Sequence, residues 1–414
     1  QVKTSRKLIF YMRQEGGIDE SMALFGIVIT IFWFALYVYV PILPSYVTHL
    51  GGSLGVVGLV VGSYGLVQML LRIPLGLWSD GIGRRKGFIV LGMFLALVSG
   101  LLMGLRPSVG TMLVGRALSG AAAATWVTFT VLFSSHFSSE DAPKAMGLAT
   151  FYSNLGQILA TFIGGYIAEL YGWQAPFVLG ALCGLAGMLL SLRIRETRQP
   201  KRERVRLSQL LVIGREKDLL IVSGLAVLVQ YMTFATMYGF TPIYAEEIGA
   251  AAAELSLLTF WSTLPMAAAA LATSWGVVSK FGRKRMVVIG FILGALAAAV
   301  VPFVKTLPQL YITQAIGSLG RGFVFPVVMG MSIQTVSEER RATAMGFFQA
   351  IYSLGMFGGP IITGIIGDIS GLTGGFVSTG AVGLLGGWLA LKLLPEEGIQ
   401  SGQAPHQVGV GGKQ

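Results

Sequence analysis

The chain has 414 residues, of which 54% are hydrophobic and only 12% are charged, and it carries a net charge of +11. Soluble proteins carry about 25% charged residues, so this composition excludes an ordinary soluble globular protein and indicates a membrane protein. The single cysteine, Cys183, excludes an internal disulfide.

Twelve segments are apolar enough to cross a membrane as helices, which takes roughly 20 predominantly apolar residues. They lie near residues 22–47, 54–78, 87–105, 108–134, 142–168, 173–192, 218–244, 254–278, 286–304, 308–332, 342–367 and 372–394. The one long connection is basic and divides the chain into six spans plus six. We expect four regions: a six-helix bundle with a short surface segment at its start (1–192), a cytoplasmic linker (193–217), a second bundle (218–394) and a disordered tail (395–414).

Lys and Arg are distributed unevenly over the connections. If the N-terminus is cytoplasmic, twenty-five of the thirty Lys and Arg residues lie on the cytoplasmic side, and only Arg106 and Lys305 lie on the other. Because Lys and Arg in short loops stay cytoplasmic, both termini are predicted to be cytoplasmic, in a multi-pass protein of a prokaryotic inner membrane. The positive charge then serves orientation in the lipid bilayer, and nucleic-acid binding is not expected.

The two bundles repeat each other at an offset near 199 residues. KAMGLATFYSNLG (Lys144 to Gly156) parallels TAMGFFQAIYSLG (Thr343 to Gly355), and Glu169 is matched by Asp368. Two homologous bundles related by an axis along the membrane normal form a transporter architecture, with the substrate site between them near mid-membrane. The expected fold is all-α, with 12 transmembrane helices in two pseudo-symmetric six-helix bundles.

A charged motif, GLWSDGIGRRKG, follows the second span. Gly83 permits a tight turn there, and Asp80 is placed to meet the positive N-terminal end of a helix from the other half. Together with Arg84 and Arg85, these residues are predicted to form a latch. The latch exists only while the cytoplasmic side is shut, and it biases a two-state equilibrium.

A weaker copy of this motif, SKFGRK, stands at the matching place in the second half and keeps Gly282, Arg283 and Lys284. The pattern Gly-xxx-Asp-xx-Gly-Arg-Arg resembles the signature between spans 2 and 3 of the major facilitator superfamily. The span count, the central linker and the repeat extend this resemblance over nearly the whole chain. It implies two rocking bundles and secondary transport, with these residues in the latch.

Three arginines lie inside predicted spans, where charged residues are rare and usually functional. Arg72 is close enough to the end of its span for its side chain to reach the membrane surface. By helical rise, Arg116 lies about 12 Å and Arg321 about 20 Å into their spans. The segment GRALSGAAAA, which contains Arg116, resembles the span 4 motif of proton-coupled drug exporters. GPIITG (Gly359 to Gly364) resembles their Gly-Pro antiporter motif.

Acidic residues are missing from the centres of the spans, since all nineteen lie in loops, at the chain ends or near span ends. Arginines that face a cavity without acids favour an anionic or zwitterionic substrate. Uncharged polar side chains need partners in hydrocarbon, so they are candidates to line a cavity. The candidates for substrate or coupling contacts are Arg116, Arg321, Tyr37, Trp126, Asn154, Gln157, Gln230, Tyr231, Gln314, Gln349 and Tyr352, with Trp33, Phe234 and Tyr238 in the same aromatic set.

These features predict a monomeric secondary active transporter that moves small amphipathic organic molecules by rocking alternating access. The first interpretation is proton-coupled export, as in multidrug or metabolite efflux by an antiporter. The second is uptake or exchange of an organic anion that Arg116 and Arg321 hold. A lipid or lysolipid carrier and a non-transporting receptor remain as alternatives.

Enzyme chemistry is not predicted. GGSLG (Gly51 to Gly55) matches a nucleophile elbow by letters, but an elbow needs a strand that enters a helix, and Ser53 is instead expected to cap the second span. His49, His136 and His406 are scattered, so no metal site is indicated. No cofactor is expected, and no phosphate-loop motif for ATP is present, so primary pumping is not expected. The resemblance to proton-coupled drug exporters implies the proton as the coupling ion.

Overall fold

The computed structural model describes residues 20–138, 141–194, 196, 215–274, 277–334, 336 and 341–395, and its regular elements in these ranges are helices. The N-terminal half contains α2 (Glu20–Tyr37), α3 (Leu43–His49), α4 (Leu54–Ile82), α5 (Lys86–Leu105), α6 (Val109–Ala124), α7 (Trp126–Ser134), α8 (Ala142–Tyr171) and α9 (Ala175–Ser191). The C-terminal half contains α11 (Lys217–Ala235), η1 (Thr236–Phe240), α12 (Thr241–Glu247), α13 (Ala252–Ser274), α14 (Val277–Phe281), α15 (Arg283–Val300), η2 (Val301–Phe303), α16 (Leu307–Gln334) and α17 (Arg341–Leu393).

The predicted membrane crossings are present as helices. Eight helical stretches are long and apolar enough to cross a membrane by length and composition. One of them lies in α17 and holds two crossings, because the backbone leaves the helical conformation at Ser370 and Gly371. Met22–Tyr37 and Ala175–Ser191 are shorter apolar helices, and α8 adds a 30-residue helix. Together they make the twelve transmembrane helices of a multi-pass integral membrane protein.

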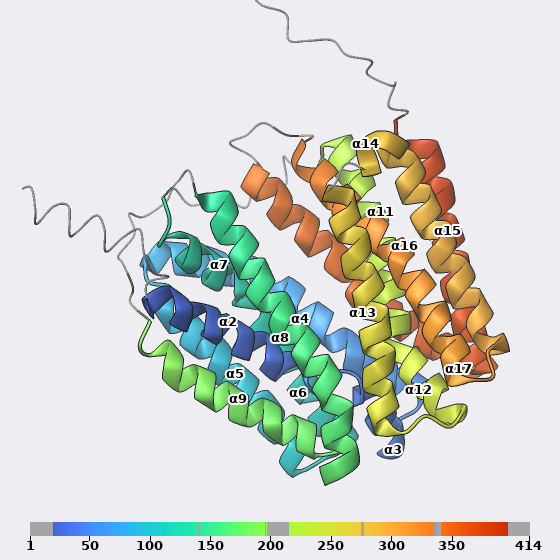
Figure 1. The fold of residues 1–414 in the computed structure, drawn as a ribbon, viewed down its shortest axis with the longest axis horizontal. Coiled ribbons are helices and arrows are strands. Elements are labelled where there is room, and N and C mark those ends of the chain that lie inside the picture. Colours follow the sequence, from blue (N-terminus) through green and yellow to red (C-terminus); the bar gives the residue numbers. More distant parts are fainter. Residues whose placement is uncertain are drawn as a thin grey trace, which may run out of the picture.

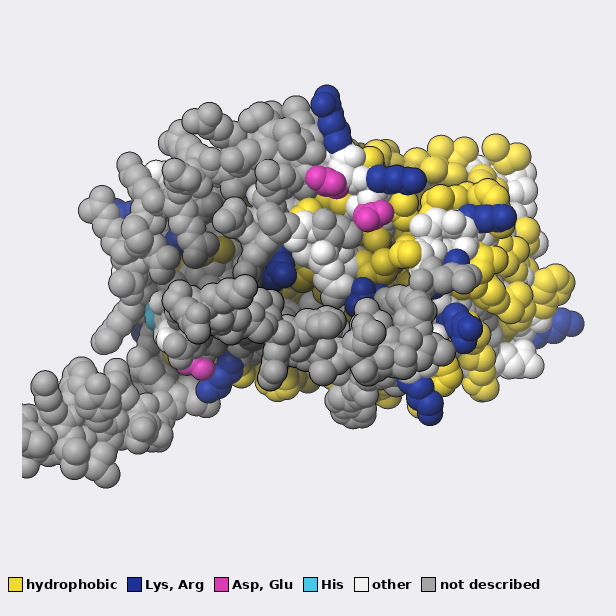
Figure 2. All heavy atoms as spheres, turned by 90° about the horizontal axis from the view of Figure 1, so that it is seen from above, with side chains coloured by type: hydrophobic (Ala, Val, Ile, Leu, Met, Phe, Trp, Pro, Cys, Tyr) yellow, Lys and Arg dark blue, Asp and Glu magenta, His cyan; other side chains and the backbone are white. Residues whose placement is uncertain are grey.

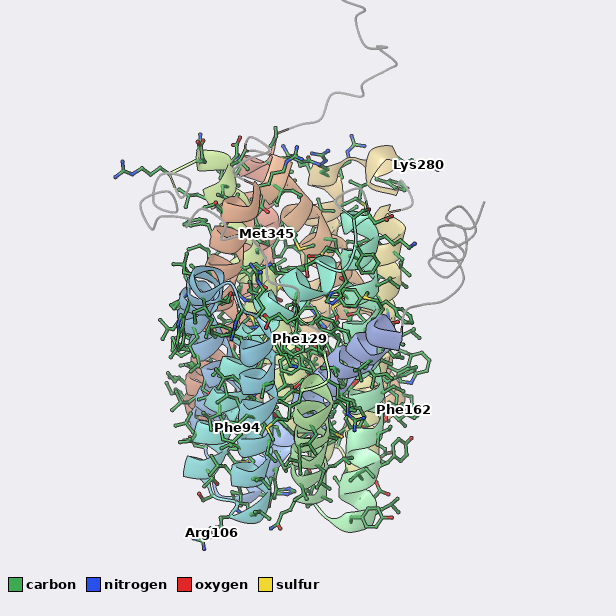
Figure 3. The ribbon with its side chains drawn as sticks, turned by 90° about the vertical axis from the view of Figure 1, so that its left-hand side faces the viewer. Phe94, Arg106, Phe129, Phe162, Lys280 and Met345 are labelled. Carbon is green, nitrogen blue, oxygen red and sulfur yellow. The ribbon has the colours of Figure 1, made fainter. Side chains whose placement is uncertain are left out.

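The two six-helix halves lie side by side (Figure 1). Arg106 marks one end of the bundle, and Lys280 marks the opposite end, which we call the Lys280 end (Figure 3). Figure 2 looks onto the Lys280 end and shows Lys and Arg side chains on this face, with hydrophobic side chains beside them. Charge is therefore concentrated at an end of the bundle, as a protein surrounded by lipid requires.

The first helix of each half is broken near its centre. Helix α2 ends at Tyr37 and α3 begins at Leu43, while in the other half α11 ends at Ala235 and passes through a π-helical turn, η1, into α12. Pro44 and Pro242 stand in the first turns of α3 and α12. Proline lacks the N–H that a continuing helix would use, so it favours a restart at such a point. The sequence predicted one uninterrupted span in each place.

Hydrogen bonds join the two halves at the end where α3 and α12 lie, which we call the joined end. The Ser53 hydroxyl and the Gly55 N–H both donate to Oδ2 of Asp368, at 2.8 and 2.9 Å. In the symmetry-related place, the Ala253 N–H donates to Oε2 of Glu169 at 2.9 Å. Ser53 is also the N-cap of α4, as predicted, since its hydroxyl accepts from the backbone of the first turn.

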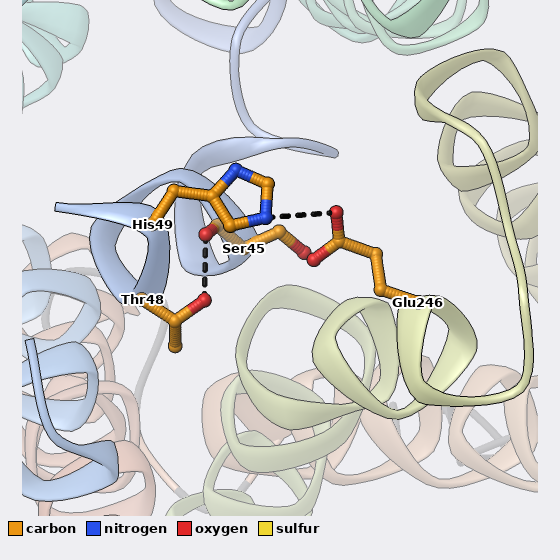
Figure 4. Close-up of polar contacts among 4 residues, drawn as sticks. All are labelled: Ser45, Thr48, His49 and Glu246. Atoms are coloured by element: carbon orange, nitrogen blue, oxygen red, sulfur yellow. Dashed lines mark hydrogen bonds and ion pairs between the residues drawn. The ribbon is translucent and has the colours of Figure 1, made fainter. Parts of the chain in front are cut away.

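A direct contact between α3 and α12 adds to the joined end (Figure 4). Nε2 of His49 lies 3.4 Å from Oε1 of Glu246, so the two groups form an ion pair when the histidine is protonated. On the α3 side, the Thr48 hydroxyl donates to the Ser45 carbonyl at 2.6 Å. An exposed pair of this kind contributes little stability, so the carboxylate caps are the stronger links between the halves.

Helices α4 and α17 form a close seam between the halves. A Cβ atom placed on Gly58 would lie 2.2 Å from the carbonyl oxygen of Pro360, and one on Gly62 would lie 2.6 Å from that of Phe357. Only glycine allows such an approach of one backbone to another. The seam therefore brings the two halves together along α4, from the joined end toward the centre of the bundle.

Candidate functional site

A buried group of aromatic and arginine side chains lies where the two halves meet. We call it the aromatic–arginine layer and define it as Tyr37, Tyr64, Arg116, Phe234, Tyr238 and Arg321. On the N-terminal side, the guanidinium carbon of Arg116 in α6 lies 4.3 Å from the ring centre of Tyr64 in α4. This is a cation–π contact, which gains strength in a desolvated place.

Aromatic contacts cross from one half to the other in this layer. The ring of Tyr64 stacks on Phe234 of α11 with centroids 6.4 Å apart, and Phe234 packs against Tyr238 of η1 at 5.1 Å. Tyr238 in turn lies 6.2 Å from Tyr37, at the end of α2. The breaks in the first helix of each half thus place two tyrosines face to edge at the centre, and π-helical turns are frequent at functional sites.

Arg321 supplies the second positive charge of the layer from α16. Its Nη2 donates to the Ser318 hydroxyl at 2.6 Å, one turn away on the same helix. Gln314, two turns before Arg321, is buried, and its Oε1 has no hydrogen-bond partner. Two of the predicted site residues of span 10 therefore lie on one side of the helix.

Trp126 is brought to the edge of the layer by an interruption that the sequence did not predict. The fourth span is split into α6 and α7 at Thr125, whose hydroxyl donates to the Ala122 carbonyl at 2.7 Å. Trp126 opens α7 and packs against Trp33 at 5.3 Å, and Trp33 lies 5.7 Å from Tyr37. Nε1 of Trp33 is a buried donor without a partner.

The remaining candidates of spans 5 and 7 differ in exposure. Asn154 on α8 is exposed, whereas Gln157 on α8 and Gln230 on α11 are half-buried. Tyr231 is buried, and its hydroxyl lies 3.1 Å from the Thr363 hydroxyl inside the C-terminal half. Accessible amides on α8 and α11 are suited to contact with a polar molecule, while Tyr231 packs between helices of its own half.

Arg72 does not extend to the membrane surface, contrary to the expectation from its position. Its Nη1 donates to Oε1 of Gln349 at 2.8 Å and to the Tyr352 hydroxyl at 3.4 Å, both on α17 in the other half. Two predicted site residues are therefore partners of a buried arginine across the seam. A buried charge needs such hydrogen bonds, which explains why Arg72 turns inward.

The predicted latch lies partly outside the described residues, because the side chain of Asp80 is not among them. Gly83 has a φ of +68° and ends α4, as the predicted turn requires. Arg84 is exposed and Arg85 is buried. Oε1 of Glu196, an acid that the sequence did not assign to this loop, accepts the backbone N–H groups of Arg85 and Lys86.

The copy of the motif in the second half also has a glycine with a positive φ angle. Gly282 has a φ of +83° and precedes α15. Nη1 of Arg283 donates to Oε1 of Gln334 at 2.6 Å, and Lys284 is also engaged in contacts. The described residues contain no cluster of three or more side chains suited to hold a metal ion.

Two residues of this region were missed from the sequence, namely Tyr64 and Gln68 of α4. Both are buried, and Oε1 of Gln68 has no partner. Together with Arg72 they are spaced by four residues, which puts all three on one face of α4. A polar row at this spacing inside an apolar span is the signal that would have revealed them.

Comparison with known proteins gives the family. The model of the Major Facilitator Superfamily matches residues 25–223 and again residues 221–409. The chain is 25% identical over 344 residues to an MFS-type transporter of Methanocaldococcus jannaschii, with 80% of this chain and 87% of the relative covered. It is 22% identical over 397 residues to multidrug resistance protein 2 of Bacillus subtilis, with 91% and 97% covered.

A solved structure has the same fold. It is the bacterial homologue of the human lysosomal transporter Spinster, in an inward-facing and occupied conformation, with a TM-score of 0.76 at 16% identity and with 89% of this chain and 95% of that chain covered. The family model matches each half in turn, and the relatives are transporters rather than enzymes. The chain belongs to the major facilitator superfamily of membrane transporters.

Proposed function

We propose that this chain exports small amphipathic organic molecules by alternating access, in exchange for protons. The observation that carries the proposal is the aromatic–arginine layer, which both halves build together near the centre of the bundle. A site built by two bundles opens to the cytoplasm when the bundles separate at their cytoplasmic ends. It opens to the outside when they separate at their outer ends. The resemblance to multidrug resistance protein 2 of Bacillus subtilis supports export.

The moving bodies of this proposal are the bundles formed by residues 1–192 and 218–394, connected by the linker 193–217. The Lys280 end faces the cytoplasm in this orientation, because Lys and Arg concentrate there. The joined end then faces outward, and its hydrogen bonds through Asp368 and Glu169 keep the outer side shut. The monomer holds both bundles, so one chain is a complete transporter.

The same carboxylates are the proton sites of the proposal. The centres of the spans lack acids, whereas Asp368 and Glu169 accept from helix N-termini across the joined end. Protonation removes the charge that makes such a hydrogen bond strong, so a proton arriving from outside weakens the contact. His49, Glu246, Glu247 and Glu254 are further titratable groups of this end.

Transport by purified protein in proteoliposomes tests this function. The probes are three naphthalene compounds of matched size, namely 2-naphthalenesulfonate, 2-naphthalenesulfonamide and (2-naphthylmethyl)trimethylammonium. An acidic lumen is expected to drive accumulation of at least one probe by exchange with protons, and an ionophore that collapses the pH gradient should abolish it. Uptake equal to protein-free liposomes for all three probes, in gradient and counterflow assays alike, would contradict the proposal.

A further inference from the structure

The two arginines of the aromatic–arginine layer are buried with N–H groups that have no acceptor. Arg116 is 2% exposed and Arg321 is 3% exposed. Nε and Nη1 of Arg116, and Nε of Arg321, lack a hydrogen-bond partner. A buried donor left in this condition destabilises the protein. The donors are therefore available to a molecule that supplies acceptors.

The contacts that these arginines do make leave their charge uncompensated. Arg116 has the ring face of Tyr64, and Arg321 has a neutral hydroxyl on its own helix. The ion pair that joins described residues, His49 with Glu246, lies at the joined end and not in this layer. A buried positive charge is stable when a negative charge accompanies it.

Arg72 provides the internal contrast. It is also buried, but its guanidinium donates to the Gln349 amide and the Tyr352 hydroxyl across the seam. Its Nε also lacks a partner, but its Nη1 has acceptors in the opposite half, so Arg72 serves as a link between the halves. Arg116 and Arg321 differ because the contacts described above stay within their own halves, with the Tyr64 ring for Arg116 and the Ser318 hydroxyl for Arg321.

From this difference we infer that the transported molecules carry an anionic group, a carboxylate, sulfonate or phosphate ester on an aromatic or similar apolar frame, held between Arg116 and Arg321. The inference rests on the proposed transport function and adds the charge of the substrate to it. Guanidinium groups bind such oxyanions through paired hydrogen bonds. Nε1 of Trp33 is a fourth buried donor without a partner, beside the layer.

One arginine comes from each half, so a bound anion would link the two halves. Arg116 lies on α6 and Arg321 on α16, so a single anion can contact both guanidiniums only while the two halves are close together at the centre. The bound molecule then stabilises a conformation in which the halves are closed around it. A ligand shifts a conformational equilibrium by its difference in affinity for the two states.

Binding of the three naphthalene probes to full-length protein in lipid nanodiscs tests the inference. Calorimetry in chloride-free gluconate buffer is expected to give a dissociation constant for 2-naphthalenesulfonate at least about tenfold lower than for the sulfonamide or the quaternary ammonium probe. The sulfonate stays ionised over the whole usable pH range, so its charge is fixed during the measurement.

Variants then assign the preference to the two arginines. Arg116→Gln and Arg321→Gln should each weaken sulfonate binding by about 10- to 100-fold and leave sulfonamide binding within about twofold. Arg321→Lys, which keeps the charge but loses the planar fork, should fall between these values. Arg106→Gln is the control variant. It removes a positive charge from an exposed position at the end opposite Lys280, and it should bind the sulfonate like the parent. Retained sulfonamide binding shows that a variant is folded.

The outcomes that overturn the inference are distinct from failure of the proposed function. Preference for the neutral or cationic probe, or unchanged sulfonate binding in both Gln variants, overturns it even if counterflow of those probes shows that the protein is a transporter. Competition by chloride with the same affinity as the sulfonate also overturns it, because the layer would then hold an inorganic ion. The inference is also overturned if none of the three probes binds.

Discussion

Glu169 and Asp368 occupy equivalent positions 199 residues apart, and each accepts a hydrogen bond from the first turn of a helix in the opposite half. The donors, Gly55 and Ala253, are themselves 198 residues apart. The internal repeat is therefore preserved as a pair of reciprocal contacts. A carboxylate at a helix N-terminus is stabilised both by the N–H groups and by the helix dipole.

Removing the charge at Asp368 should loosen the joined end. In Asp368→Asn the hydrogen bonds to Ser53 and Gly55 lose their charged acceptor, which costs about 1–2 kcal/mol and shifts the equilibrium about tenfold toward separation of the halves. Spin labels on cysteines at the exposed positions Arg106 and Lys305, in a Cys183→Ser background, report this as a longer distance in pulsed electron resonance.

The control for this variant is Glu254→Gln. Glu254 caps the start of α13 from within its own half, by accepting the Ala251 N–H at 2.8 Å. It makes a similar local bond without joining the halves, so the distance distribution should match that of the parent. The prediction is contradicted if the spin-label distance also increases in Glu254→Gln, or if it does not increase in Asp368→Asn.

Gly58 should be intolerant of any side chain. In Gly58→Ala the new methyl group would overlap the Pro360 carbonyl oxygen, and overpacking of this kind costs about 1–3 kcal/mol. We expect a lower melting temperature together with wider separation of the spin labels. Gly224→Ala is the matched control, because nothing lies within 4 Å of its added Cβ, and it should be neutral or slightly stabilising.

Arg72 and Gln349 should be energetically coupled across the seam. Each single change, Arg72→Met or Gln349→Met, breaks the 2.8 Å hydrogen bond, so the double variant should lose less stability than the two single losses together. The expected coupling is about 1–3 kcal/mol for a hydrogen bond to a charged group. Thermal unfolding in nanodiscs measures the melting shifts of all three variants. Strictly additive shifts would show that the bond contributes nothing.

Gly83 should be required for its left-handed backbone conformation. A residue with a Cβ at φ +68° costs about 1–2 kcal/mol, so Gly83→Ala should lower the melting temperature and slow transport. Gly87, four residues on, has open space and no such backbone, and Gly87→Ala should behave like the parent. Equal effects of the two changes would argue against a strained turn at Gly83.

The membrane helices were predictable because an apolar run of twenty residues has few alternatives in a bilayer. The breaks at Tyr37 and Thr125 were not predicted, because the apolar pattern continues through both points. Pro44 was the local signal for the first of them. The partner of Arg72 was not predictable either, since Gln349 lies 277 residues away in the sequence. Arg116 and Arg321 were found as isolated charges, but the contact of Arg116 with the Tyr64 ring depends on how α4 and α6 pack.

The seam between α4 and α17 has a consequence for how fast the halves can part and return. Where Gly58 faces Pro360 and Gly62 faces Phe357, backbone meets backbone, and few long side chains must be reordered there when the helices come together. Ordering a long side chain costs up to about 2 kcal/mol of conformational entropy. In the proposed alternating-access cycle, a contact made mainly of main-chain atoms avoids that cost each time the halves close.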